Sequence, residues 1–157
     1  VWGKLIPYWI LAIMSFMLMV ITVNWVFAVP WKGSIIETLL LGSAFSFLLI
    51  ALCFVFSALF PDPVQAVQMP LLYLMPGLLY SGLSWPDFSM SNLGQAISTI
   101  MPLKYICINL RDLLLLGFSP NLLSNVLIMY ISGTVLLMVS GVIFYLRNKA
   151  LTKEVAL

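Results

Sequence analysis

The sequence contains no histidine and very little charge. Only 8% of its 157 residues are charged, about a third of the share in an ordinary soluble domain, and 63% are hydrophobic. These proportions exclude a water-soluble globular domain and, more firmly, a disordered chain. Catalytic triads and metal sites that need an imidazole are excluded with them.

Other sequence signals of a catalytic or binding site are missing as well. Cys53 and Cys107 lie far apart in apolar surroundings and do not form a paired-thiol metal motif. A net charge of +2 is too small to indicate a nucleic-acid partner. No glycine loop of the GxxxxGK type is present, so the chain does not itself hydrolyse ATP. We therefore expect no catalytic, cofactor or metal site in this chain.

Long uncharged runs are what the sequence does contain. A membrane-spanning helix needs about 20 mostly apolar residues, and each of four runs is long enough for one. In lipid the backbone must satisfy its own hydrogen bonds, so these segments are expected to be helices in an all-α, polytopic membrane protein. No span has an acidic residue at its centre, which disfavours ion-coupled carriers and enzymes with buried carboxylates. The predicted spans are 5–29, 38–60, 64–84 and 121–146.

Polar residues at two run boundaries predict helix starts. Ser34 with Glu37 forms a capping box for the second span. Asp62 followed by Pro63, with Gln65 one turn later, gives the third span a similar start.

Four spans place both ends of the chain on the same side of the membrane. Basic residues on that side slightly outnumber those on the other, which places both ends in the cytoplasm. The basic residues on the side of the termini are Lys4, Arg147, Lys149 and Lys153, and those on the opposite side are Lys32, Lys104 and Arg111.

The segment 85–118 is too long for a tight turn and too apolar for a free loop. Asn92 with Gln95 predicts the start of a short helix, and Pro102 interrupts it. A second helix is expected over 103–116, ending at Gly117. Each helix has one apolar side, so the pair either forms a re-entrant hairpin or lies on the membrane surface.

A few polar and small residues have two interpretations. Arg111 and Asp112 form either a gate or a local interfacial charge pair. Asn24 and Gln68 either line a path or, more in keeping with lone amides in membranes, bond between helices. Small residues at packing spacing allow close helix approach, within the chain or between copies. These pairs are Gly42 with Ser46, Gly77 with Ser81, and Gly133 with Gly141.

Several of these residues recur in one family pattern. The runs QAVQMPLLYLMPGLLYSGLSWPDFSM and IMPLKYICINLRDLLLLG, with the opening GKLIPY and the loop FAVPWKGS, resemble the permeases of the type-2 ATP-binding-cassette export family. One departure is Ser91, where the family usually has proline after the methionine. The matching positions are Gln65, Gln68, Pro76, Ser81, Gly82, Pro86, Met90, Pro102, Leu103, Tyr105, Arg111 and Gly117.

The resemblance implies that residues 1–157 are the C-terminal part of a single transmembrane permease domain. Such permeases have six spans, so these would be the last four, with the N-terminal half absent. Residues 85–118 would be a re-entrant hairpin that dips in from outside, and 147–157 a cytosolic tail. The implied location is the bacterial inner membrane.

The implied function is that of a permease subunit in an ATP-driven exporter of hydrophobic or amphipathic substrates. The implied partners are a second permease copy, making a homodimer, two cytosolic ATPase subunits that hold ATP and Mg²⁺, and membrane lipid. Residues expected on the ATPase-coupling side are Gly3, Lys4, Pro7, Asp62 and Gln65. Residues expected at an outer gate in the hairpin are Ser81, Gly82, Pro86, Met90, Pro102, Tyr105, Arg111 and Gly117.

Two other classes of function remain open at this stage. One is a carrier or channel that works without ATP, and the other is a membrane scaffold or anchoring subunit. Substrate flux without ATP would favour the first, and a tight partner complex without transport would favour the second.

Overall fold

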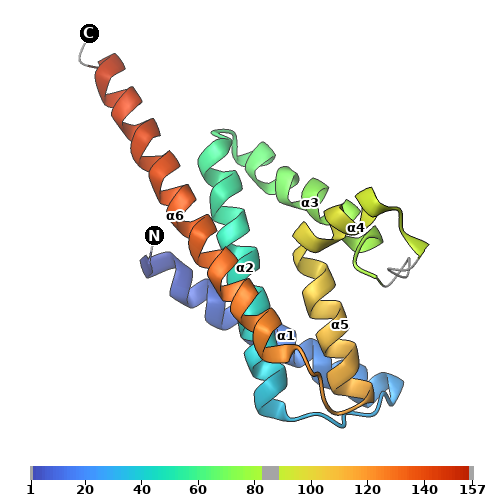
Figure 1. The fold of residues 1–157 in the computed structure, drawn as a ribbon. Helices are drawn as coiled ribbons and strands as arrows, with labels where there is room; N and C mark the ends of the chain where they lie inside the picture. The colour runs from blue at the N-terminus through green and yellow to red at the C-terminus, as the bar shows by residue number, and fades with distance from the viewer. Residues whose placement is uncertain (1, 83–88, 156–157) are drawn as a thin grey trace.

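The computed structural model describes residues 2–82 and 89–155, and all regular secondary structure within these ranges is helical (Figure 1). The predicted all-α class is therefore confirmed. The helices are α1 (Trp2–Phe27), α2 (Ile35–Leu59), α3 (Pro63–Leu79), α4 (Asn92–Ile100), α5 (Pro102–Leu115) and α6 (Leu122–Val155).

The centre of the fold is a pair of long helices, α2 and α6, that run side by side in the same direction (Figure 1). The hydroxyls of Ser43 and Tyr130 are 2.7 Å apart, across a separation of 87 residues. Further along, Arg147 Nη1 donates to the carbonyl oxygen of Ala58 over 3.4 Å, across 89 residues. The sequence separation between contacting residues is nearly constant along the pair, as it is for parallel helices. Parallel helices need a long connection, and α3, α4 and α5 form it.

Glycines allow α2 to approach its neighbours closely. A Cβ atom on Gly133 of α6 would lie 2.8 Å from the Phe47 ring and 3.4 Å from Leu48 Cα. A Cβ atom on Gly42 would overlap the Phe16 ring of α1. Gly141 has nothing within 4 Å of such an atom. Of these predicted packing glycines, Gly42 and Gly133 therefore serve contacts within the chain.

In the part of the chain that the structure describes, three helices are long and apolar enough to cross a membrane: Leu5–Phe27, Ile35–Leu59 and Leu122–Arg147. They correspond to the first, second and last predicted spans. The third predicted span, 64–84, contains only the 17 residues of α3, which rise about 26 Å against a hydrocarbon thickness of about 30 Å. A fourth crossing therefore stays a prediction.

The two short helices expected between the last two spans are present as α4 and α5, joined at Met101. The first begins differently from the prediction. Its N-cap is Ser91, not Asn92, because the Ser91 hydroxyl accepts from Gly94 N over 3.3 Å. The second ends as predicted, since Gly117 follows α5 with a φ of 81° that favours glycine.

The hairpin of α4 and α5 is held at both ends. Near its bend, a Cβ atom on Gly77 of α3 would lie 3.3 Å from both Met101 Sδ and Leu103 Cδ1. At its far end, Lys32 N donates to the carbonyl oxygen of Leu114 over 3.3 Å. The hairpin thus connects α3 to the loop between α1 and α2. Its depth in a membrane stays a prediction.

Local hydrogen bonds agree with two predicted helix starts and change one amide assignment. Ser34 Oγ accepts from Ile36 N over 3.3 Å, and Asp62 Oδ1 accepts from Val64 N over 3.2 Å. Asn24, however, donates to the carbonyl oxygen of Val29 over 2.6 Å. The prediction that it bonds between helices was wrong, because the amide closes the end of its own helix.

Candidate functional site

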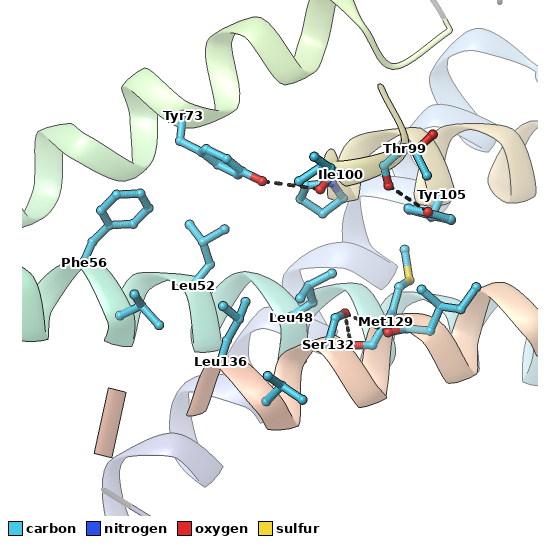
Figure 2. Close-up of a pocket in the computed structure, with 14 residues that line it drawn as sticks. Leu48, Leu52, Phe56, Tyr73, Thr99, Ile100, Tyr105, Met129, Ser132 and Leu136 are labelled. Carbon is cyan, nitrogen blue, oxygen red and sulfur yellow. Dashed lines mark hydrogen bonds between the residues drawn. The ribbon is translucent and has the colours of Figure 1, made fainter. Parts of the chain in front are cut away.

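An apolar cavity of about 540 Å³ lies where α2, α3, α6 and the hairpin of α4 and α5 meet (Figure 2). This volume is in the range of small-molecule sites, about 300–1,000 Å³. Most of the side chains that line it are aliphatic or aromatic. We name it the hairpin cavity.

The parallel pair α2 and α6 forms one wall of the hairpin cavity. Leu48, Leu52 and Phe56 come from α2, and Met129 and Leu136 from α6. Two of them, Leu48 and Met129, belong to the buried core that α2, α5 and α6 share. This wall is therefore fixed by the packing of the core.

The opposite wall comes from α3 and the bend of the hairpin. In Figure 2 the Tyr73 side chain extends from α3 toward Ile100 at the end of α4. Its hydroxyl donates to the carbonyl oxygen of Ile100 over 3.4 Å. Its ring centroid is 6.2 Å from that of Phe56 on α2. Tyr73 thus spans the gap between α2 and the hairpin at one end of the cavity.

The remaining hydroxyls of the cavity bond to nearby backbone. The Tyr105 hydroxyl donates to the carbonyl oxygen of Thr99 over 2.8 Å and closes the bend between α4 and α5 (Figure 2). Thr99 Oγ1 donates to the carbonyl oxygen of Gln95 over 2.9 Å. Ser132 Oγ donates to that of Ile128 over 2.7 Å. No charged side chain lines the cavity among the residues the structure describes.

Three predicted gate residues meet at a second, much smaller cavity of about 40 Å³. Ser81 and Gly82, after the end of α3, lie there beside Arg111 of α5. Gly82 has a φ of 83°, and Ser81 is buried with its hydroxyl donating to the carbonyl oxygen of Leu78 over 2.8 Å. Asp112, which follows Arg111 on α5, also lines this cavity.

The other predicted gate residues are dispersed. Pro102 and Tyr105 line the hairpin cavity. Gly117 lies at the far end of α5, and Met90 lies just before the N-cap of α4. Pro86 falls outside the described residues. The predicted gate set therefore divides between the two cavities and the ends of the hairpin.

The predicted coupling residues lie at the starts of two helices. Gly3, Lys4 and Pro7 belong to the first turns of α1, where Gly3 and Pro7 are exposed. Asp62 caps α3, and Gln65 is exposed in its first turn. This exposure leaves both helix starts accessible in the chain described.

Sequence reasoning missed the pairing of Arg147 with the end of α2. Arg147 contacts the Ala58 carbonyl, and it lines a cavity of about 340 Å³ with Phe60, Pro63 and Phe144. A cation near the last carbonyls of a helix interacts favourably with the negative end of the helix dipole. The sequence shows Arg147 as the residue that ends an uncharged run. Its contact with Ala58 could not be predicted, because it depends on the parallel packing of α2 and α6.

Sequence reasoning also missed a buried amide, Asn109 of α5, whose exposed fraction is 0%. Its Nδ2 donates to the carbonyl oxygen of Tyr105 over 2.6 Å. Its Oδ1 accepts from Ser119 Oγ over 2.8 Å. Asn109 therefore fixes the connection between α5 and α6 to the body of α5.

A helical membrane fold with an apolar cavity between its helices can hold a small apolar molecule. The family model described as ABC-2 family transporter protein matches residues 1–142. The chain therefore belongs to the ABC-2 transporter family, and it is a multi-pass membrane protein.

Two curated relatives, from Escherichia coli K12 and Escherichia coli O157:H7, are both described as "Probable multidrug ABC transporter permease YbhS". Each is 27% identical to this chain over 132 residues, which cover 83% of the chain and 35% of the relative. The chain thus spans about a third of their length. No solved structure matches it.

Proposed function

We propose that the chain is part of the permease subunit of an ATP-driven exporter that moves hydrophobic or amphipathic substrates out of the cytoplasm. The observation that carries this proposal is the hairpin cavity, a large apolar space between helices in a member of a transporter family. The multidrug description of the relatives agrees with an apolar substrate.

The proposed partners are an ABC ATPase, present in two copies, and a second copy of the permease. ATP and Mg²⁺ would be held by the ATPase, and the permease would carry out no covalent chemistry. ATP binding would favour one of two permease conformations, so transport is a shift of population between them. The exposed starts of α1 and α3, with Gly3, Pro7, Asp62 and Gln65, are the proposed contact region.

The proposed location is the bacterial inner membrane, with both ends of the chain in the cytoplasm. The placement of the connections supports this topology. Figure 1 places the turn between α2 and α3 and the far end of α6 at one end of the fold. The connections between α1 and α2 and between α5 and α6 lie at the other end. Such an arrangement fits crossings of one membrane by α2 and α6 in the same direction.

The test is transport into inside-out membrane vesicles that contain the full-length permease and its ATPase. A fluorescent hydrophobic dye should accumulate with ATP and not with a non-hydrolysable ATP analogue. Equal accumulation under both conditions would identify a carrier or channel. A stable ATPase complex that moves none of a broad panel of apolar dyes would identify a scaffold.

A further inference from the structure

Each hydroxyl group of the hairpin cavity donates to a backbone carbonyl. Each hydroxyl carries one proton. Those of Tyr73 and Tyr105 go to the carbonyls of Ile100 and Thr99, and those of Thr99 and Ser132 go to carbonyls of their own helices. These hydroxyl groups therefore present oxygen lone pairs to the cavity.

The end of α4 adds to this acceptor character. Thr99 and Ile100 both line the cavity and form the last residues of α4, where the carbonyls carry the negative end of the helix dipole. Their carbonyl oxygens accept from the hydroxyls of Tyr105 and Tyr73, respectively (Figure 2). A carbonyl oxygen has two lone pairs, so each keeps one acceptor position.

Two positions in the first turn of α5 have no N–H to offer the cavity. Pro102, which lines the cavity, has no backbone N–H. The N–H of Lys104 is already bonded to the carbonyl oxygen of Met101 over 3.3 Å. The Lys104 side chain is not among those that line the cavity. Among the described residues that line the cavity, an anion would meet oxygen lone pairs and apolar surface, and no charged side chain.

We infer that the hairpin cavity binds amphiphiles whose polar group is a hydrogen-bond donor without negative charge, and that it rejects anionic amphiphiles of the same shape. The apolar body would lie against Leu48, Leu52 and Leu136, and the donor would face the carbonyls of Thr99 and Ile100. This inference deepens the proposed function, since it assigns a ligand chemistry to the same cavity.

Three fluorescent probes of one shape test the chemistry in the full-length permease in detergent micelles. N-Phenyl-2-naphthylamine is neutral and has one N–H donor. Its N-methyl derivative lacks the donor. 2-Anilinonaphthalene-6-sulfonate keeps the N–H and adds a negative charge on the other naphthalene ring, away from the N–H. All three become fluorescent in apolar surroundings, so saturable binding is measured by titration.

The expected order of affinity follows from the cavity. The amine should bind at least about tenfold more tightly than the sulfonate, because the anion loses its hydration without a partner. It should bind about twofold to tenfold more tightly than the N-methyl derivative, which is the size of one hydrogen bond. Equal affinity for the three probes, or tighter binding of the sulfonate, would overturn the inference.

Two matched pairs of variants locate the binding. Ser132→Phe fills the cavity from α6, whereas Ser124→Phe makes the same change at an exposed position that does not line it. Saturable amine binding should disappear only in the first. Thr99→Lys adds a cation at the cavity, and Ala96→Lys adds one at an exposed position of the same helix outside it. Only Thr99→Lys should raise the affinity for the sulfonate to that for the amine.

These outcomes are separable from those of the transport test. Amine binding that is unchanged in Ser132→Phe, or a preference for the amine over the sulfonate that is unchanged in Thr99→Lys, would place the ligand elsewhere. The probe comparison uses the unaltered protein, so it decides the ligand chemistry even where a variant fails to fold. A permease can export with ATP and still fail this binding test, in which case only the inference about the cavity is lost.

Discussion

The hydroxyls of Ser43 on α2 and Tyr130 on α6 lie 2.7 Å apart and form a polar link between the two parallel central helices. The Tyr130 ring also packs on Phe47, with ring centroids 5.6 Å apart. Ser43 has a further contact, since its carbonyl oxygen accepts from Trp9 Nε1 of α1 over 2.9 Å. One position on α2 thus connects three of the four longest helices.

Tyr130→Phe should lower stability slightly. The Ser43 hydroxyl keeps its bond to the carbonyl oxygen of Leu40, so the cost is that of one hydrogen bond, about 0.5–1.5 kcal/mol. Thermal unfolding of the full-length protein in detergent measures it. Tyr145→Phe, at an exposed position of the same helix, is the control. Equal shifts of the unfolding temperature in the two variants would mean that the hydrogen bond between Ser43 and Tyr130 does not contribute to stability.

Gly133→Leu should separate α2 from α6. Its side chain would enter the space now held by the Phe47 ring and the backbone at Leu48, and overpacking of this kind costs about 1–3 kcal/mol. Gly141→Leu makes the same change on the same helix where nothing lies within 4 Å. Thermal unfolding should show a clear loss for Gly133→Leu alone. Tolerance at both positions would contradict the packing described.

The sequence was sufficient for features that depend on neighbours along the chain. Uncharged runs located three long helices, Asp62 marked the start of α3, and Gly117 marked the end of α5. Proline at 102 predicted the bend of the hairpin. In each case the physical cause, lipid solubility or a local backbone requirement, acts over a few residues.

A choice between adjacent capping residues and the contacts between distant residues both escaped prediction. Ser91 caps α4 because its hydroxyl reaches Gly94 N, and Asn92, one residue later, has the same capping ability. The partners of Tyr130 and Arg147 lie 87 and 89 residues away, and hydropathy does not reveal that α2 and α6 are parallel. The hairpin cavity exists only because that pair is covered by the hairpin.

Gly82→Val should impair export while leaving assembly intact. Gly82 has a φ of 83°, and a branched side chain there costs about 1–2 kcal/mol, which would shift the turn beside Arg111. Gly82→Asn should retain export, because asparagine tolerates this backbone region. Transport in vesicles and size-exclusion chromatography measure the two properties. An unchanged export rate in Gly82→Val would end the assignment of Gly82 to an outer gate.

Asn109→Ala should destabilise the hairpin. It removes two hydrogen bonds of a fully buried amide and leaves the Ser119 hydroxyl without that partner, at about 1–3 kcal/mol. Asn121→Ala, at an exposed position, is the control. Amide hydrogen exchange of α5 should rise in Asn109→Ala alone. If exchange rises equally in both variants, Asn109 does not anchor the connection between α5 and α6.

The most direct test of the exporter proposal is gentle detergent purification of the full-length protein from its native host, with co-purifying proteins identified by mass spectrometry. The proposal predicts an ABC ATPase in equal amount, two copies for two permeases. Its absence, under conditions that preserve other membrane complexes of the same cells, would contradict the proposal of ATP-driven export.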